Sequence, residues 1–191
     1  MANITALARS PLHGRMPFQG SQTQIAERPF IGKLTLRGNA EDTGFAAGVG
    51  SILGVSLPTE PNTVTETGVC QISWVGPDEW LIYTADGAQK PLQERLKTAL
   101  EGIHSAVVDV SDYYTIIRIS GTRARDVLAK GCPLDLHPRV FRPGRCAGSL
   151  FLKAAIRIIQ IDDTPIYDLQ VRWTFAEYLF QHLVRGAEEW N

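Results

Sequence analysis

Residues 147–171 read AGSLFLKAAIRIIQIDDTPIYDLQV, and this stretch decides the fold class. Three short runs within it, 147–153, 156–161 and 166–171, are rich in apolar and β-branched residues, as strands are. The sequence DDTP between the last two runs is a typical turn, so these runs are predicted to be neighbouring strands. The stretch therefore predicts three consecutive strands of an antiparallel or mixed sheet.

The rest of the chain combines short strands with helices. Further strands are predicted at 30–37, 69–75, 80–84, 106–110 and 114–119. Helices are predicted after the capping residues Asn39 or Asp42, after Pro91, after Gly121 and, from the capping-box pair Thr174 and Glu177, near the end of the sequence. This order is not the strict alternation of a doubly wound parallel sheet. It predicts an α+β fold with mixed or antiparallel sheets and packed helices, built as two similar strand–helix halves.

The domain organisation follows from the same pattern. Residues 1–27 are predicted to form an extended N-terminal arm, because proline and glycine residues interrupt any regular element there. Residues 28–191 are predicted to form a single globular α+β domain with two pseudo-repeated halves, at about 28–103 and 104–191.

Charge and cysteine content exclude several classes of protein. Lysine and arginine total 19, aspartate and glutamate total 20, and a net charge of -1 gives no long-range attraction to nucleic acid or to an anionic membrane. No apolar run approaches the ~20 residues that span a bilayer. Three cysteines without a Cys-x-x-Cys pair fit reduced thiols better than a disulfide scaffold. We expect a cytoplasmic protein with no nucleic-acid and no membrane partner.

The segment GVGSILG at 48–54 invites comparison with a dinucleotide-binding fingerprint. Its glycine spacing differs from that fingerprint by one residue. The glycines also fall late in a predicted helix, whereas a pyrophosphate binds at a helix N-terminus. We expect close helix packing here.

Two further clusters are weak candidates for a metal site or a catalytic site. Cys132, His137 and Cys146 match no common zinc spacing. Asp109 and Ser111, with His104 upstream, lack the strained nucleophile turn of a hydrolase. Buried thiols in the first cluster and hydrogen bonds to turn backbone in the second are the interpretations we favour.

The loop 132–146 is the best candidate for a partner interface. Three prolines stiffen it, so docking costs little entropy, and arginine side chains bind carboxylates bidentately. The candidate interface residues are Asp135, His137, Arg139, Arg142 and Arg145 of this loop, with Pro11 and Leu12 of the arm. The alternative is a solvated loop whose arginines only keep it soluble.

Several motifs of the sequence resemble the gamma subunit of heterotetrameric sarcosine oxidase. They are VDVS at 108–111, IRISG at 117–121, ARDVL at 124–128, GCPLDLHP at 131–138, GPDEWL at 76–81 and SPL at 10–12. The likeness covers most of the chain from about residue 25, and the segment 130–145 is its most specific part.

The resemblance implies a fold related to the folate-binding domain of glycine-cleavage T-protein. In that domain an acidic residue handles the folate-bound chemistry. The corresponding stretch here, KAAIRI at 153–158, carries no carboxylate, and arginine stays protonated and cannot replace one. The expectation is a retained fold whose central cleft lacks the ionisable side chains for one-carbon transfer.

The resemblance also implies a role. The chain is expected to be a non-catalytic accessory subunit, with no cofactor or metal of its own. The holoenzyme oxidatively demethylates sarcosine to glycine, with alpha and beta subunits holding FAD, FMN, NAD and tetrahydrofolate and a delta subunit holding zinc. One alternative is an independent folate-binding aminomethyltransferase-like enzyme. The other is a regulatory module with a reactive cysteine, but Cys70 falls within a predicted strand and not on an exposed loop.

Overall fold

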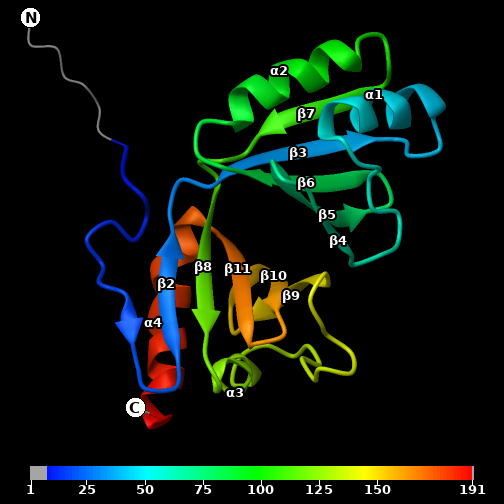
Figure 1. Ribbon diagram of the computed structural model, residues 1–191. Helices are drawn as coiled ribbons and strands as arrows, with labels where there is room; N and C mark the ends of the chain where they lie inside the picture. Colours follow the sequence, from blue (N-terminus) through cyan, green and yellow to red (C-terminus); the bar gives the residue numbers. More distant parts are fainter. Residues whose placement is uncertain (1–7, 191) are drawn as a thin grey trace, which may run out of the picture.

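The computed structural model describes residues 8–190, in which two antiparallel β-sheets meet face to face and each carries helices on its outer face (Figure 1). This arrangement confirms the predicted α+β class. Among the helices of residues 8–190, none combines the length and the apolar character needed to cross a membrane.

The first sheet has five strands in the order β4-β5-β6-β3-β7. Its strands are β3 (Gly32–Gly38), β4 (Val64–Glu66), β5 (Cys70–Gly76), β6 (Glu79–Thr84) and β7 (Ser105–Asp109). Two helices cover it, α1 (Thr43–Leu53) and α2 (Gln89–Ala99). The Asp42 side chain caps α1 by accepting a hydrogen bond from the Phe45 amide at 3.0 Å, and Gly54 ends it with a φ of 73°.

The glycines of α1 have a packing role. A Cβ added to Gly48 would lie 3.0 Å from the carbonyl oxygen of Ala99, so the absence of a side chain lets α1 approach α2 closely. This contact confirms that the segment 48–54 serves helix packing. Beneath the two helices, Trp80 is fully buried and donates its indole N–H to the Pro58 carbonyl at 2.7 Å.

The second sheet has six strands in the order β1-β2-β8-β11-β10-β9. Its strands are β1 (Phe18–Gln19), β2 (Gln24–Arg28), β8 (Tyr114–Ser120), β9 (Cys146–Phe151), β10 (Ala154–Asp162) and β11 (Ile166–Arg172). Helices α3 (Ala124–Ala129) and α4 (Ala176–Ala187) cover its outer face, with short 3-10 turns η1 (Trp173–Phe175) and η2 (Glu188–Trp190) beside α4. Strands β9, β10 and β11 are the three that residues 147–171 predict.

The N-terminal segment is more ordered than the sequence predicts. Strand β2 pairs along β8 over five residues, and Ile25 within it is fully buried. Residues 24–27 therefore lie inside the sheet, between β1 and β8, where their backbone groups are paired and the Ile25 side chain is buried. The division into an arm and a domain with two halves stays a prediction. The predicted boundary near residue 104 does not separate the two sheets, because β7, which follows it, pairs with β3, which precedes it.

Three local predictions are wrong. The last helix begins at Ala176 without a side-chain cap, and Glu177 binds Arg15 and Gln181 in place of the predicted capping box. The apolar run at 106–110 predicts a buried strand, but β7 is an edge strand that exposes Ala106 and Val108. The segment 56–68, rich in proline, threonine, asparagine and glutamate, predicts a loop, but it contains β4, which forms by pairing with β5.

A third apolar layer joins the inner faces of the two sheets. It contains Leu81 and Tyr83 from β6, Ile116 from β8, and Cys146 and Ile159 from β9 and β10. This layer does not fill the whole space between the sheets, and the remaining space is the candidate site.

Candidate functional site

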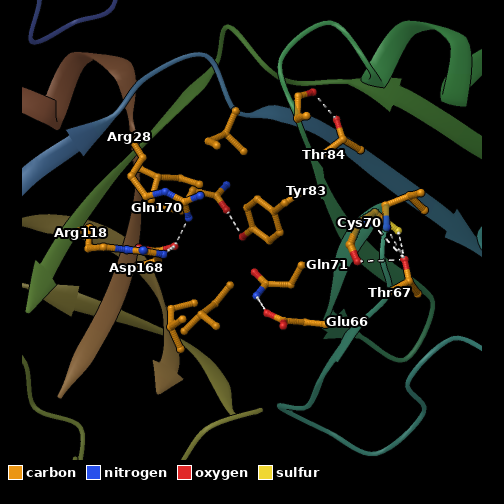
Figure 2. Close-up of a pocket in the computed structure, with 16 residues that line it drawn as sticks. Arg28, Glu66, Thr67, Cys70, Gln71, Tyr83, Thr84, Arg118, Asp168 and Gln170 are labelled. Atoms are coloured by element: carbon orange, nitrogen blue, oxygen red, sulfur yellow. Dashed lines mark hydrogen bonds and ion pairs between the residues drawn. The ribbon is translucent and has the colours of Figure 1, made fainter. Parts of the chain in front are cut away.

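A cavity of about 410 Å³ lies between β5 and β6 of one sheet and β2, β8, β10 and β11 of the other (Figure 2). Its polar lining residues are Arg28, Glu66, Thr67, Cys70, Gln71, Tyr83, Thr84, Arg118, Asp168 and Gln170, and its apolar ones include Ile31, Ile116, Ile159 and Ile161. The volume and the mixed lining are typical of a small-molecule pocket.

Asp168 holds two arginines at one side of this cavity. It stands directly opposite Arg118 in the antiparallel register of β11 and β8. The Arg118 guanidinium donates to it from Nε at 2.7 Å and from Nη2 at 2.9 Å, and Arg28 on β2 donates from Nη1 at 2.6 Å. The hydrogen bonds to Asp168 raise the pKa of Arg118. The carboxylate is almost fully buried and carries three charge-assisted hydrogen bonds.

The expectation concerned the ionisable side chains that one-carbon transfer needs, and the cleft does contain one buried carboxylate, that of Asp168. Residues 153–158 indeed carry no carboxylate, but Asp168 enters the cleft from the neighbouring strand β11. The second carboxylate of the lining belongs to Glu66, which is exposed and accepts a hydrogen bond from the Gln71 side chain. Both carboxylates are thus already engaged by other side chains of this chain.

Tyr83 and Gln170 connect the two sheets across the cavity. The Tyr83 hydroxyl, on β6, donates to the amide oxygen of Gln170 on β11. Burial raises the pKa of the Tyr83 phenol well above its ordinary value, so the hydroxyl stays protonated as a donor. The contact fixes the spacing of the sheets at this point.

The Cys70 thiol stands at the far wall of the cavity. Cys70 is buried, and its backbone N–H donates to Thr67 Oγ1 at 3.1 Å, with the sulfur 3.4 Å from the same oxygen. This tight turn encloses the sulfur at the start of β5 and does not present it on an exposed loop.

The candidate interface residues of the loop 132–146 lie mostly on the surface. Asp135, His137, Arg139 and Arg142 are exposed. The Asp135 carboxylate accepts the His137 backbone N–H at 2.9 Å, so the loop is internally braced. Arg145 is half-buried and pairs with Glu60 at 2.8 Å, which already occupies its guanidinium.

The two arm residues of the predicted interface differ in their environment. Pro11 is half-buried beside a second cavity, described below. Leu12 is buried in the core beneath α4, so its assignment to an interface is wrong for the folded chain. Because β1 and β9 are opposite edges of the second sheet, the arm and the loop lie far apart (Figure 1). The structure does not bring them together.

The remaining candidate clusters are structural. Asp109 accepts hydrogen bonds from the Ser111 backbone at 2.9 Å and hydroxyl at 2.5 Å, which confirms their role in a turn. His104 lies beyond the other end of β7. Cys132 and Cys146 are buried but His137 is exposed, and within residues 8–190 no three His, Cys, Asp or Glu side chains gather as metal ligands would.

Sequence reasoning missed the arginine–aspartate cluster. A signal was present, because Arg118 and Asp168 each stand inside a strand with an apolar or aromatic residue on either side. A charged residue in such a position is almost never buried without a partner of opposite charge. Pairing the two would have required the strand register.

The geometry now defines a class. The fold is shared with the glycine cleavage system aminomethyltransferase T of Bartonella henselae, at a TM-score of 0.63 and 12% identity over 86% of this chain and 46% of that one. At this identity the likeness shows the fold alone. The chain is thus a domain of the T-protein folate-binding fold, with its cleft carboxylate held by two arginines.

Comparison of sequences is more specific. The family model of the sarcosine oxidase gamma subunit family matches residues 37–189, and the chain belongs to this family. It is 29% identical to the sarcosine oxidase subunit gamma of an Arthrobacter species and to that of Corynebacterium sp. strain P-1, in each case over 97% of this chain and 92% of the relative.

A solved structure agrees with this assignment. A chain of the heterotetrameric sarcosine oxidase from Corynebacterium sp. U-96, in complex with pyrrole 2-carboxylate, superposes with a TM-score of 0.88. It is 26% identical, with 97% of both chains covered. The family resemblance predicted from the motifs is confirmed.

Proposed function

We propose that this chain acts as a non-catalytic accessory subunit of a heterotetrameric sarcosine oxidase and stabilises the assembly by burying surface on its alpha, beta and delta subunits. In this proposal the partner subunits hold FAD, FMN, NAD, tetrahydrofolate and zinc. The complex demethylates sarcosine oxidatively to glycine, producing hydrogen peroxide and, with tetrahydrofolate, 5,10-methylenetetrahydrofolate. The whole would operate in the cytoplasm.

The observation that carries the non-catalytic role is the state of Asp168. A general base needs an accessible lone pair that can reach the proton it abstracts. Asp168 is almost fully buried and its carboxylate is clamped by Arg28 and Arg118. Such an ion pair orders the strands that line the cleft, and both carboxylate oxygens are already engaged by guanidinium donors.

The test uses the purified single chain and the reconstituted complex. We expect the chain alone to show no flavin absorbance and no sarcosine-dependent peroxide production, and to bind the remaining subunits when they are co-expressed. Flavin absorbance that co-purifies with the single chain, or activity without partners, would overturn the proposal.

One observation favours the alternative of an independent folate-binding enzyme, namely the partly polar cavity of about 410 Å³ between the sheets. Titration of the isolated chain with tetrahydrofolate discriminates, because micromolar binding lost in Asp168→Asn would favour the enzyme. The third possibility, a module with a reactive cysteine, requires fast thiol labelling of Cys70 in the native protein, and its burial opposes this.

A further inference from the structure

Four aromatic side chains are exposed near one end of the second sheet. Phe30 lies between β2 and β3, Tyr113 precedes β8, and Trp173 and Phe175 form η1 after β11. The Trp173 backbone N–H donates to the Tyr113 carbonyl at 3.1 Å, which holds two of these segments together. In Figure 1 the ends of β2, β8 and β11 meet at the junction of the two sheets. We call these four residues the aromatic cluster.

A second cavity, of about 420 Å³, opens at the aromatic cluster. Phe30 and Trp173 line it, together with Pro11 of the N-terminal segment. Tyr114 also lines it, and Tyr113 packs edge-on against Tyr114 with ring centroids 4.6 Å apart. The Arg172 guanidinium lies 5.3 Å above the Tyr113 ring. Aromatic rings and arginine around a hollow are the composition of the energetically dominant part of protein–protein interfaces.

The backbone of Phe30 supports a functional role for this surface. Its φ is 58°, in the left-handed region, which costs a bulky residue about 1 kcal/mol or more and which glycine or asparagine adopts readily. Phe30 is 45% exposed, so its packing within this chain offsets only part of that cost. Strain retained at an exposed apolar side chain is typical of a binding site.

Lys33 provides a buried positive charge in the wall of the cavity. It lines the cavity yet is only 2% exposed. Its ammonium donates to the carbonyls of Ile31 at 2.6 Å and Ser111 at 3.3 Å, and within residues 8–190 no carboxylate forms an ion pair with it. A buried ammonium has three donors and favours an anionic partner. A carboxylate that enters from outside would supply one.

We propose that the aromatic cluster and this cavity form a docking site for another subunit of the sarcosine oxidase, which covers the rings with apolar side chains and places an aspartate or glutamate side chain at Lys33. The inference rests on the proposed function and names the surface that it uses. A protein segment fits better than a small molecule, because Tyr113 and Phe175 extend the exposed aromatic surface beyond the cavity lining. This surface is distinct from the loop 132–146 at the opposite edge of the sheet.

The experiment measures the affinity of the purified chain for the co-expressed remaining subunits. Trp173→Ala is expected to weaken binding at least tenfold, and Lys33→Met by a similar factor. Phe30→Asn is expected to raise the melting temperature while weakening binding, since it relieves strain and removes a contact. The matched control is Leu150→Ala on β9, a side chain that is 50% exposed, and its affinity should stay within about twofold of wild type.

A pH series identifies the role of Lys33 separately from packing. Affinity of the wild type should fall between about pH 7.5 and about pH 9.5, because deprotonation removes the charge that attracts the carboxylate. The other charged groups near Lys33 are Asp109, Asp112, Glu27, Asp86 and Arg9. Lys33→Met should bind with no such slope.

The outcomes separate the two proposals. If the wild-type chain binds none of the other subunits, the proposed function fails. If the wild type binds but Trp173→Ala and Phe30→Asn bind within twofold of it and affinity does not change with pH, the docking inference alone fails. Near-ultraviolet circular dichroism verifies that each variant is folded, and the wild-type pH series decides the question for Lys33 if Lys33→Met is unstable.

Discussion

Arg118 and Asp168 face each other across β8 and β11 and form a bidentate ion pair, with Nε–Oδ1 at 2.7 Å and Nη2–Oδ2 at 2.9 Å. The register of these two strands places both side chains opposite each other within one sheet, without any contribution from the other sheet. Arg28 on the next strand then completes the cluster at 2.6 Å. Three neighbouring strands therefore share one buried negative charge.

Asp168→Asn should destabilise the fold, because it leaves two guanidinium groups with no carboxylate between them. The expected loss is about 1–3 kcal/mol, below the value for a fully buried pair, since the Arg28 and Arg118 side chains are 39% and 33% exposed. Urea unfolding monitored by tryptophan fluorescence measures it. Asp126→Asn, which breaks the exposed pair with Arg123, is the control and should change stability little. Equal losses of unfolding free energy in the two variants would show that the buried cluster stabilises the fold no more than an exposed ion pair does.

Lys33 should make stability depend on pH in the alkaline range. Burial lowers its pKa from 10.5 to about 8, against the opposing effect of Asp112, Asp109 and Glu27. The unfolded chain therefore binds more protons between the two values, and the free energy of unfolding rises with pH in that window. A shift of this size corresponds to about 3 kcal/mol.

The matched variant for this prediction is Lys33→Met. Urea unfolding of both proteins at about pH 7.5, 8.5 and 9.5 should show wild type gaining stability relative to the variant as pH rises. Parallel curves would mean that Lys33 keeps an ordinary pKa in the folded state.

Leu12→Ala should cost about 2–4 kcal/mol, because Leu12 is 4% exposed and packs in the core beneath α4. Met16→Ala, four residues further along, removes a side chain that is 82% exposed and should change stability little. Thermal unfolding of the two variants compares them directly. If Leu12→Ala has the same melting temperature as the wild type, the N-terminal segment does not contribute to the stability of the fold.

Gly121→Ala should be destabilising by about 2 kcal/mol or more. Gly121 has a φ of 111°, and an added Cβ would lie 2.3 Å from the Gln22 carbonyl oxygen, a backbone atom that has little room to move. Gly68→Ala is the control, since its added Cβ would meet nothing within 4 Å. Differential scanning calorimetry distinguishes the two, and a neutral Gly121→Ala would show that the turn 20–23 can shift.

The elements that sequence predicts well depend on neighbouring residues. Asp42 and Gly54 bound α1 because capping is local, and the runs within 147–171 form strands because short turns join them. The elements that the sequence does not predict depend on residues far away along the chain. Strand β2 is a strand through its pairing with β8, and the Arg118–Asp168 pair joins positions 50 residues apart. The site was missed for the same reason, since its cavity exists only where the two sheets meet.

The pairing of the early strand β2 with the late strand β8 has a consequence during synthesis on the ribosome. Strand β2 emerges among the first residues, yet its partner β8 ends at Ser120, so almost a hundred residues are translated before its hydrogen bonds can form. The intervening five-stranded sheet becomes complete only with β7, just before β8. Strands β1 and β2 therefore cannot join their sheet until the second half of the chain has been translated. The last step of folding closes the six-stranded sheet, and a fragment that stops near residue 110 would leave β2 without its partner β8 and Ile25 without the core that buries it.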